Sequence, residues 1–290
     1  MNAKRTPATV RVSVRLRRDG PRCRTMVHYC PSSGSSEEEE RMVAVSRSVV
    51  GVVSRLYRYP VKSFAGESPN RVRIERYGLY GDRSHAFVDG TKQGWERYVT
   101  ARQLPHMLAW KAEFVFGPEP PADEFPPLRI TSPQGETFGW DERLLQTVQR
   151  GAKPVLSLER HRPDSADLLA VDAESVLIVT DRSLAQLERS WGKSLDPRRF
   201  RPNLIVKTDE RLSLEDGDWI GRTASIGEAE LLVRGPCERC TMITIDPDTL
   251  ERSPALLKTV NAAYGLCFGL YATVVKPGDV KLGDAVAFVG

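Results

Sequence analysis

The sequence predicts a mainly β fold with a few helices, of the α+β class. Many short runs of β-branched and aromatic residues are separated by Gly and Pro turns, which is typical of a small barrel or sandwich. Only two segments show the apolar periodicity of an amphipathic helix. Parallel βαβ alternation and a G-x-G-x-x-G motif after a strand are both absent from the sequence, which disfavours a dinucleotide-binding fold.

In the first half of the chain, a strand is expected in the run that begins near Val49 and ends before Pro60. Turn residues separate the strands that follow, which are expected at 71–76, 85–89, 109–115 and 127–131. A helix is expected at 142–150, where Leu144, Leu145 and Val148 share one face and Gly151 ends the element.

The second half is expected to open with strands near 153–159 and 176–179. A helix is expected at 182–191, with Asp181 as its cap and Gly192 as its stop, because Leu184, Leu187 and Trp191 form an apolar stripe. The remaining strands are expected at 203–207, 218–227, 229–234, 241–245, 271–276 and 284–289.

The N-terminal segment differs from the rest of the chain in composition and charge. Residues 1–41 hold nine basic and five acidic residues, whereas the remaining residues hold 33 of each. An Arg-rich stretch, a Ser-rich run and four glutamates follow one another with little apolar periodicity. We expect residues 1–48 to form a disordered tail; an organelle transit peptide and an over-extended start before Met42 are the alternatives.

Composition narrows the function classes. The neutral charge balance after residue 41 gives no indication of a nucleic-acid partner. No run of eighteen apolar residues occurs, so no membrane span is expected. Five cysteines without a secretory segment indicate a reducing, cytoplasmic location. The four histidines are scattered, which makes a histidine-based zinc enzyme improbable.

The most specific local feature is the C-x-x-C pair formed by Cys237 and Cys240, between two expected strands. A structural zinc site would need two further ligands, and only Cys267 lies nearby in the sequence. A thioredoxin-like pair would need a helix after Cys237, whereas a hairpin is expected here. A buried structural pair and a single thiolate ligand for a soft metal both remain open on this motif alone.

The wider context of the pair and five further segments decide between these alternatives. The stretch from Gly235 to Thr249 resembles the cysteine segment of MOSC domains, in the branch that contains the mitochondrial amidoxime reducing component and bacterial relatives. The family's other signatures resemble, in chain order, Tyr59-Pro60-Val61-Lys62-Ser63, Gly81-Asp82-Arg83, Thr100-Ala101-Arg102-Gln103-Leu104-Pro105, Phe200-Arg201-Pro202-Asn203 and the closing run 278–286. The resemblance covers residues from about 50 to 290.

This resemblance implies an architecture and a cofactor site. It implies an N-terminal β-barrel-like domain at 49–150 packed on a MOSC β-barrel domain at 151–290. It also implies a molybdenum cofactor (Mo-molybdopterin) with Cys240 as the metal ligand and catalytic residue. The residues implied to hold the pterin and its phosphate are Lys62, Ser63, Arg83, Asp172, Arg201 and Asn203. Arg forks, a Lys charge, a hydroxyl and an amide suit a phosphate.

The sequence also departs from the family pattern. Ala173 and Glu174 stand where relatives carry small hydroxyl residues, and Leu250 replaces a usual glycine. A carboxylate beside a phosphate is unfavourable, so we expect either that Glu174 points away or that the cofactor lies differently. Arg102 is a candidate for an ion pair that joins the two domains.

The leading functional hypothesis is a molybdenum-dependent oxidoreductase that reduces small N-hydroxylated, N-oxide or S-oxide substrates. The chain has neither iron–sulfur cysteine spacing nor a C-x-x-C-H haem motif, so electrons must come from a separate iron–sulfur, flavin or haem reductase. The alternatives are a sulfur carrier that holds a cysteine persulfide and a non-enzymatic carrier of the molybdenum cofactor.

Overall fold

The computed structural model describes residues 48–116 and 123–289. The tail expected at 1–48 lies outside these residues except for Ser48, which begins the first strand. The prediction of a mainly β fold with a few helices is confirmed, because fifteen strands and three α-helices occur in the described residues. None of these helices combines the length and the apolar composition that a membrane crossing requires.

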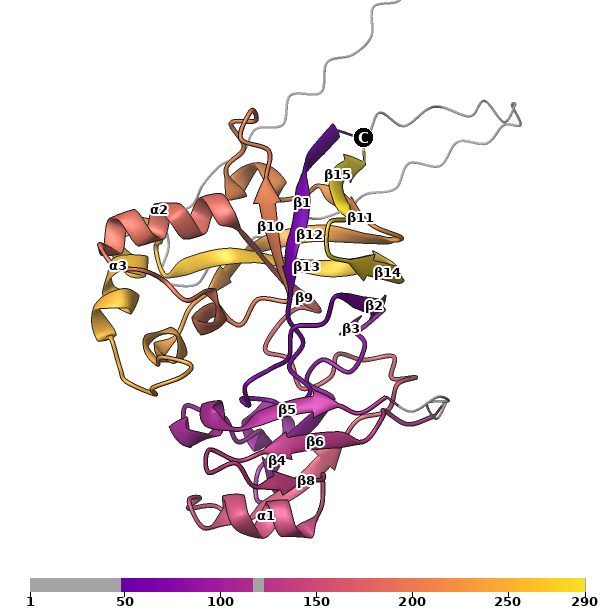
Figure 1. The fold of residues 1–290 in the computed structure, drawn as a ribbon, viewed down its shortest axis with the longest axis vertical. Coiled ribbons are helices and arrows are strands. Elements are labelled where there is room, and N and C mark those ends of the chain that lie inside the picture. The colour runs from indigo at the N-terminus through magenta and orange to yellow at the C-terminus, as the bar shows by residue number, and fades with distance from the viewer. Residues whose placement is uncertain (1–47, 117–122, 290) are drawn as a thin grey trace, which may run out of the picture. The chain divides into compact units, whose positions relative to one another are not determined.

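Seven strands form a closed barrel, in the order β1, β10, β9, β13, β12, β11, β15. Strand β1 closes it, because it pairs antiparallel with β10 on one side and with β15 on the other (Figure 1). Only β9 and β10 run parallel within it. The strands are β1 (Ser48–Leu56), β9 (Val176–Thr180), β10 (Leu204–Thr208), β11 (Thr223–Ile226), β12 (Ala229–Glu238), β13 (Cys267–Lys276) and β15 (Ala285–Val289).

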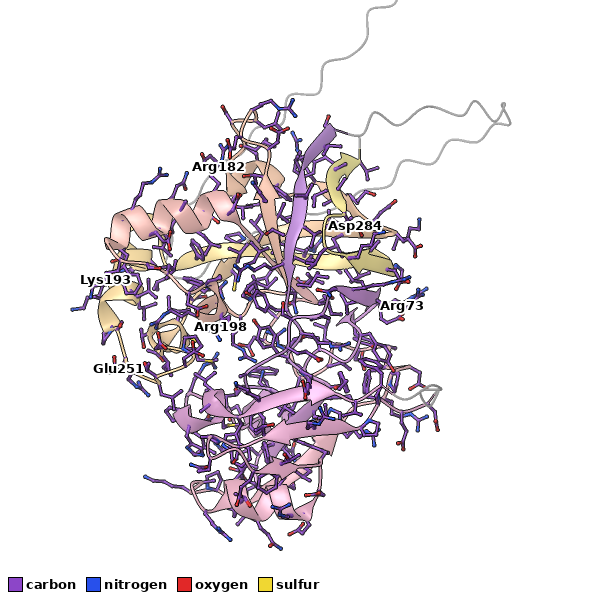
Figure 2. The ribbon with its side chains drawn as sticks, in the orientation of Figure 1. Arg73, Arg182, Lys193, Arg198, Glu251 and Asp284 are labelled. Carbon is purple, nitrogen blue, oxygen red and sulfur yellow. The ribbon has the colours of Figure 1, made fainter. Side chains whose placement is uncertain are left out.

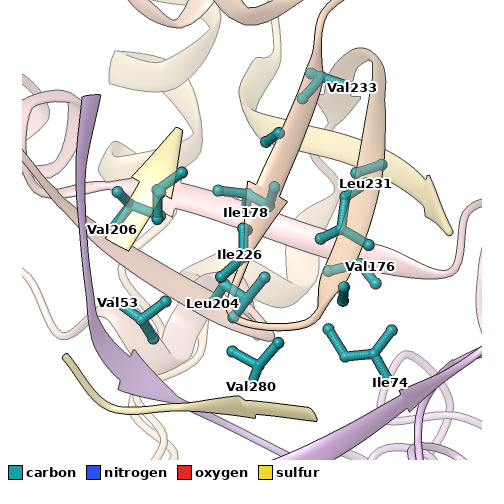
Figure 3. Close-up of a cluster of buried hydrophobic side chains, with 14 of the residues drawn as sticks. Val53, Ile74, Val176, Ile178, Leu204, Val206, Ile226, Leu231, Val233 and Val280 are labelled. Atoms are coloured by element: carbon teal, nitrogen blue, oxygen red, sulfur yellow. The ribbon is translucent and has the colours of Figure 1, made fainter. Parts of the chain in front are cut away.

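The barrel interior is filled by β-branched and aliphatic side chains that alternate along the strands. In β12, Ala229, Leu231 and Val233 are fully buried, as the two-residue period of a half-buried strand requires. Figure 3 shows Leu231 and Val233 in the same cluster as Ile178 of β9 and Leu204 of β10. These side chains form one continuous apolar cluster inside the barrel.

Three smaller sheets accompany the barrel. An aromatic core lies among their strands and includes Phe64, Phe87, Trp110 and Phe125. The sheets are β14 (Gly278–Lys281) with β2 (Arg71–Glu75) and β3 (Gly78–Leu79), β4 (His85–Asp89) with β8 (Leu156–Arg160), and β5 (Lys111–Phe114) with β6 (Leu128–Thr131) and β7 (Thr137–Phe138).

Strand pairing crosses the predicted domain boundary after residue 150 in both directions. Strand β1 comes from the first half of the chain but lies in the barrel, and β2 pairs with β14 near the C-terminus. Strand β8 comes from the second half but pairs with β4. The boundary itself stays a prediction, and these pairings bring distant sequence motifs into one place.

Both predicted helices are present, with one difference in capping. Helix α1 (Glu142–Gln149) follows Asp141, which accepts a hydrogen bond from the Leu144 N–H. Helix α2 (Asp181–Trp191) is capped by Thr180 rather than by the expected Asp181, whose carboxylate instead accepts from Thr208. Gly192 ends α2 in the left-handed conformation, as expected.

Two expectations near the cysteines were wrong. Residues 241–245 do not form a strand; Thr241–Thr244 form a 3-10 turn, η5, whose Thr244 hydroxyl donates to the Thr241 carbonyl. The expected hairpin is therefore absent, and β12 pairs instead with β13. Between them lies helix α3 (Pro254–Tyr264), which was not predicted although Pro254 and the left-handed Gly265 are standard helix limits.

Other short 3-10 turns connect the strands. The turn η4 replaces the first part of the strand expected at 218–227. The turns are η1 (Gly94–Arg97), η2 (Pro105–Ala109), η3 (Pro197–Phe200), η4 (Asp216–Trp219) and η5 (Thr241–Thr244).

The barrel core should be sensitive to cavity formation. We expect Leu231→Ala to lower the free energy of unfolding by about 3 kcal/mol, because it deletes a fully buried side chain. The control Val155→Ala, at a 77% exposed position, should change it by less than about 0.5 kcal/mol. Urea denaturation measures both, and equal effects would contradict the assigned barrel interior.

Candidate functional site

Three of the predicted site residues have a strained backbone. Ser63, Arg83 and Arg201 have φ angles of 68°, 51° and 52°, in the left-handed region that disfavours residues with a side chain. They make up three of the five such non-glycine residues among those described. Strain of this kind clusters at functional sites, where the surrounding structure holds it in place.

The buried carboxylate of Asp82 joins several of these segments. Its Oδ1 accepts a hydrogen bond from the Tyr59 N–H at 2.8 Å. Its Oδ2 accepts from Asn203 Nδ2 at 3.1 Å and from Arg83 Nη1. The Asn203 Oδ1 in turn accepts from the Leu177 N–H at 3.0 Å. The structure therefore places Asn203 in the framework of the site, with its amide already bonded to protein groups.

Lys62 is the most buried cation of the site. Its Nζ donates to the Ala170 carbonyl at 2.8 Å and to Asp172 Oδ1 at 2.7 Å, and it lies 4.1 Å from the centre of the Trp95 ring. Burial lowers the pKa of Lys62 to about 8, and the neighbouring Asp172 offsets this only in part. Ser63 beside it accepts a hydrogen bond from the Ala101 N–H, which leaves its hydroxyl proton free to donate.

Two guanidinium groups share the ring of Tyr59. Arg83 Cζ lies 4.4 Å and Arg201 Cζ 4.0 Å from the ring centre. Arg201 Nη1 donates to the Phe64 carbonyl, whereas its Nη2 is buried and has no hydrogen-bond partner. Burial, and secondly the charge of Arg83, lower the pKa of Arg201 to about 10. A buried donor without a partner is costly, so an acceptor from a bound group is the natural complement of Arg201.

Arg102 links Cys240 to the charged groups. Its guanidinium donates to Asp172 Oδ2 at 3.3 Å and lies close enough to the Cys240 thiol to interact with it electrostatically. The expected ion pair of Arg102 across the predicted boundary is thus confirmed. Burial acts to raise the pKa of Asp172, but Lys62 and Arg102 outweigh it and hold that pKa below its ordinary value. We refer to Lys62, Arg83, Arg102 and Arg201 as the cationic cluster.

The two cysteines of the C-x-x-C pair have different surroundings. Cys240 is partly exposed and stands at the start of η5. Cys237 is buried, donates to the Glu238 carbonyl, and has its pKa raised by burial. Arg239 between them donates to the carbonyls of Phe268 and Phe200. Only Cys240 of this pair is therefore accessible to a ligand.

Glu174, which departs from the family pattern, is directed to another partner. Its Oε2 accepts a hydrogen bond from the Thr273 hydroxyl at 2.8 Å. Asp172, two residues earlier, keeps its bonds to Lys62 and Arg102. The backbone between them turns the two carboxylates to different neighbours, which agrees with the expectation that Glu174 points away from the cationic cluster.

The donor set fits a phosphorylated cofactor with a thiolate-bound metal. No group of three or more His, Cys, Asp or Glu side chains suited to a metal ion occurs in residues 48–116 and 123–289. A metal at Cys240 would therefore depend on the cofactor for its other ligands. The excess of cations over the carboxylates of Asp82 and Asp172 suits a phosphate, and the unpaired Arg201 Nη2 offers a further donor.

The structure brings together all seven predicted residues or their direct neighbours through these contacts. It also shows contributors that sequence reasoning did not select. Asp82 and Arg102 lie inside the quoted motifs, so their position was a usable signal. Tyr59 also lies inside a quoted motif, whereas Trp95 carries no such signal, because its role depends on stacking against Lys62 from a distant segment.

Comparison with known proteins identifies two matching family models. The MOSC N-terminal beta barrel domain matches residues 50–170 and the MOSC domain matches residues 165–287. These matches confirm the resemblance inferred from the motifs and the predicted class of an N-terminal β-barrel domain with a MOSC domain.

Curated relatives agree with this result. The human protein named mitochondrial amidoxime reducing component 2 is 32% identical over 288 residues, covering 82% of this chain and 83% of its own length. Mouse mitochondrial amidoxime-reducing component 1 is 28% identical over 290 residues, with 83% of each chain covered. A molybdenum cofactor sulfurase from Anopheles gambiae is 37% identical over 149 residues, covering 49% of this chain and 18% of its own length.

The low pKa of Lys62 predicts a pH dependence of stability. Between pH 8 and 10.5 the unfolded chain holds a proton that folded Lys62 has released, so the free energy of unfolding rises with pH in this window. Relative to Lys62→Met, the wild type should gain stability as pH rises from 8 to 10. Urea denaturation at several pH values measures this, with the exposed Lys258→Met as control. Parallel curves for wild type and Lys62→Met would contradict the prediction.

The role of Asp82 predicts a large effect from a small substitution. Asp82→Asn should lower the free energy of unfolding by about 3 kcal/mol, because buried Arg83 loses its counter-charge and one acceptor becomes a donor. The matched Asp164→Asn, in an exposed ion pair with Arg162, should change it by less than about 0.5 kcal/mol. Urea denaturation measures both variants. If they lost a similar amount of stability, the structural role assigned to Asp82 would be contradicted.

Proposed function

Since the chain belongs to the MOSC-domain proteins related to the mitochondrial amidoxime reducing components, we propose that it is a molybdenum-cofactor-dependent oxidoreductase. The proposed substrates are N-hydroxylated compounds and N- or S-oxides. The observation that supports this most directly is the double contact of Arg102 with Cys240 and Asp172. It connects the accessible thiol to the cationic cluster that suits the cofactor's phosphate.

The proposal gives each residue of the site a role. Lys62, Arg83 and Arg201 hold the phosphate and pterin by charge, and the Ser63 hydroxyl donates to the same group. Asn203 and Asp82 orient these side chains rather than contact the cofactor, because their polar atoms are already bonded within the protein. Asp172 fixes Lys62 and Arg102.

Cys240 is the proposed metal ligand. When bound, the molybdenum centre would supply two-electron redox chemistry. For an amidoxime the overall reaction consumes two electrons and two protons, cleaves the N–O bond, and releases an amidine and water. The electrons are proposed to come from a separate reductase, because the sequence has neither iron–sulfur cysteine spacing nor a C-x-x-C-H haem motif.

A sulfur-carrier function is the second candidate. It is supported by the similarity to a molybdenum cofactor sulfurase, although this chain spans only 18% of that protein's length. In this case Cys240 would hold a persulfide, since Cys237 is buried. The third possibility, transfer of intact cofactor to another enzyme, shares the same pocket and differs by the absence of turnover.

Cys240→Ser should remove most of the molybdenum that copurifies with the protein from a cofactor-competent host, because the thiolate ligand is lost. Cys237→Ser is the matched control and should retain it, because Cys237 is buried away from ligands. Metal analysis and pterin fluorescence measure occupancy, and reduction of an amidoxime with an artificial electron donor measures activity. Equal molybdenum in both variants would exclude Cys240 as the ligand; persulfide on Cys240 without molybdenum would favour the sulfur carrier.

A further inference from the structure

A cavity of about 220 Å³ lies beside the cationic cluster. Of the seven predicted site residues, Arg201 alone lines it, so Lys62 and Cys240 lie outside its wall. Figure 2 labels Arg198, which contributes to its wall from the η3 turn. Its apolar walls include Tyr57, Tyr59, Leu108, Met242, Ile245 and Pro247. We call this space the neutral cavity.

Apart from Arg201, the charged residues that line the neutral cavity are paired within the protein. Arg198 bonds to Asp196 and Asp248, and Arg199 donates to Asp246 at 2.6 Å. Glu67 accepts from Arg58 at 2.7 Å. A cationic ligand would have to compete for these carboxylates or remain uncompensated, whereas an uncharged apolar group would not.

Residues 65–68 form one wall of the cavity, and Gly66 in this wall packs closely against Tyr59. A Cβ atom on Gly66 would lie 2.4 Å from the Arg58 carbonyl oxygen and 2.5 Å from Tyr59 Cδ1, so only glycine allows this approach. Tyr57 and Tyr59 are stacked at 6.5 Å, and the Tyr59 hydroxyl donates to the Pro202 carbonyl. Packed aromatic and apolar walls with satisfied polar atoms are typical of a pre-formed small-molecule site.

Part of the wall of the neutral cavity lies close in sequence to Cys240, the candidate metal ligand. Met242 follows Cys240 by two residues, and Arg201 belongs to both the cationic cluster and the cavity wall. The cavity wall therefore includes one residue close in sequence to Cys240 and one residue of the cationic cluster.

We propose that the neutral cavity binds the uncharged aromatic or apolar part of the substrate and discriminates against cations. This inference rests on the proposed function and identifies where its substrate is held. An amidoxime is uncharged near neutral pH, whereas the amidine formed from it is protonated. The reaction therefore converts a group that the cavity accepts into a cation, for which the cavity wall offers no unpaired carboxylate. Hydration in water then favours release of the charged product.

Binding of simple probes tests the cavity without reference to turnover. In calorimetric titrations of the full chain at neutral pH, benzamide should bind at least tenfold more tightly than benzamidinium and than acetamide. Ala65→Phe fills the cavity and should weaken benzamide binding at least tenfold, because Ala65 lines it while its backbone keeps its bond to Trp110. Ala262→Phe, on the exposed side of α3, is the matched control and should bind as the wild type does.

Kinetics of the cofactor-loaded enzyme provide the second measurement. Ala65→Phe should raise the KM for benzamidoxime at least tenfold and leave that for acetamidoxime nearly unchanged. Ser68→Trp, at the exposed rim of the cavity, should act in the same direction if Ala65→Phe fails to fold.

The outcomes separate the two proposals. Unchanged benzamide affinity and KM in both cavity variants would overturn the substrate site while leaving the oxidoreductase function intact. Selective benzamide binding without any turnover by the molybdenum-loaded wild type would support the cavity and contradict the function. Loss of pterin or molybdenum from Ala65→Phe, with Ala262→Phe unaffected, would assign the cavity to the cofactor and overturn the inference.

Discussion

The carboxylate of Asp82, which is 3% exposed, is the group on which the rest of the site depends. It bonds the backbone of Tyr59, just after the first barrel strand, and the side chain of Asn203, just before the neighbouring strand β10. It also neutralises Arg83, whose other nitrogen donates to the Arg201 carbonyl. A charge so deeply buried requires partners on every side. Those partners hold the strained backbone of Arg83 and Arg201 in place, which explains why this conformation survives at charged residues.

Two regions with different electrostatics meet at Arg201. In the cationic cluster, positive groups outnumber carboxylates, and the Nη2 of Arg201 is left without an acceptor. In the neutral cavity, each of Arg198, Arg199 and Glu67 has a partner of opposite charge. The first arrangement suits a phosphate and the second suits an uncharged ring. With Cys240 nearby in the chain, the proposed cofactor and the proposed substrate would therefore have distinct chemical environments that share Arg201.

Local signals predicted most elements correctly and failed where long-range contacts prevailed. Helix α2 follows from the stripe of Leu184 and Leu187 and from Gly192, all within one short segment. The stretch 241–245 is apolar enough for a strand, but it forms a turn, because β12 continues to Glu238 and pairs with β13. No periodicity within the stretch indicates that pairing. Helix α3 has standard boundary residues in Pro254 and Gly265. It was not predicted because its polar and apolar residues are only weakly separated onto opposite faces.

The sequence by itself determined the β-rich class, the family through six ordered motifs, and the residue types that a phosphate and a soft metal require. These depend on identity and spacing, which are visible without coordinates. The tertiary structure decided which of these residues bond within the protein and which are available to a ligand. It showed that Asn203 and Asp82 serve the framework, that Arg102 contacts Cys240, and that Glu174 bonds Thr273. Only the closed barrel, in which β1 pairs with both β10 and β15, brings these distant segments together, and hydrogen bonds act only across such short distances.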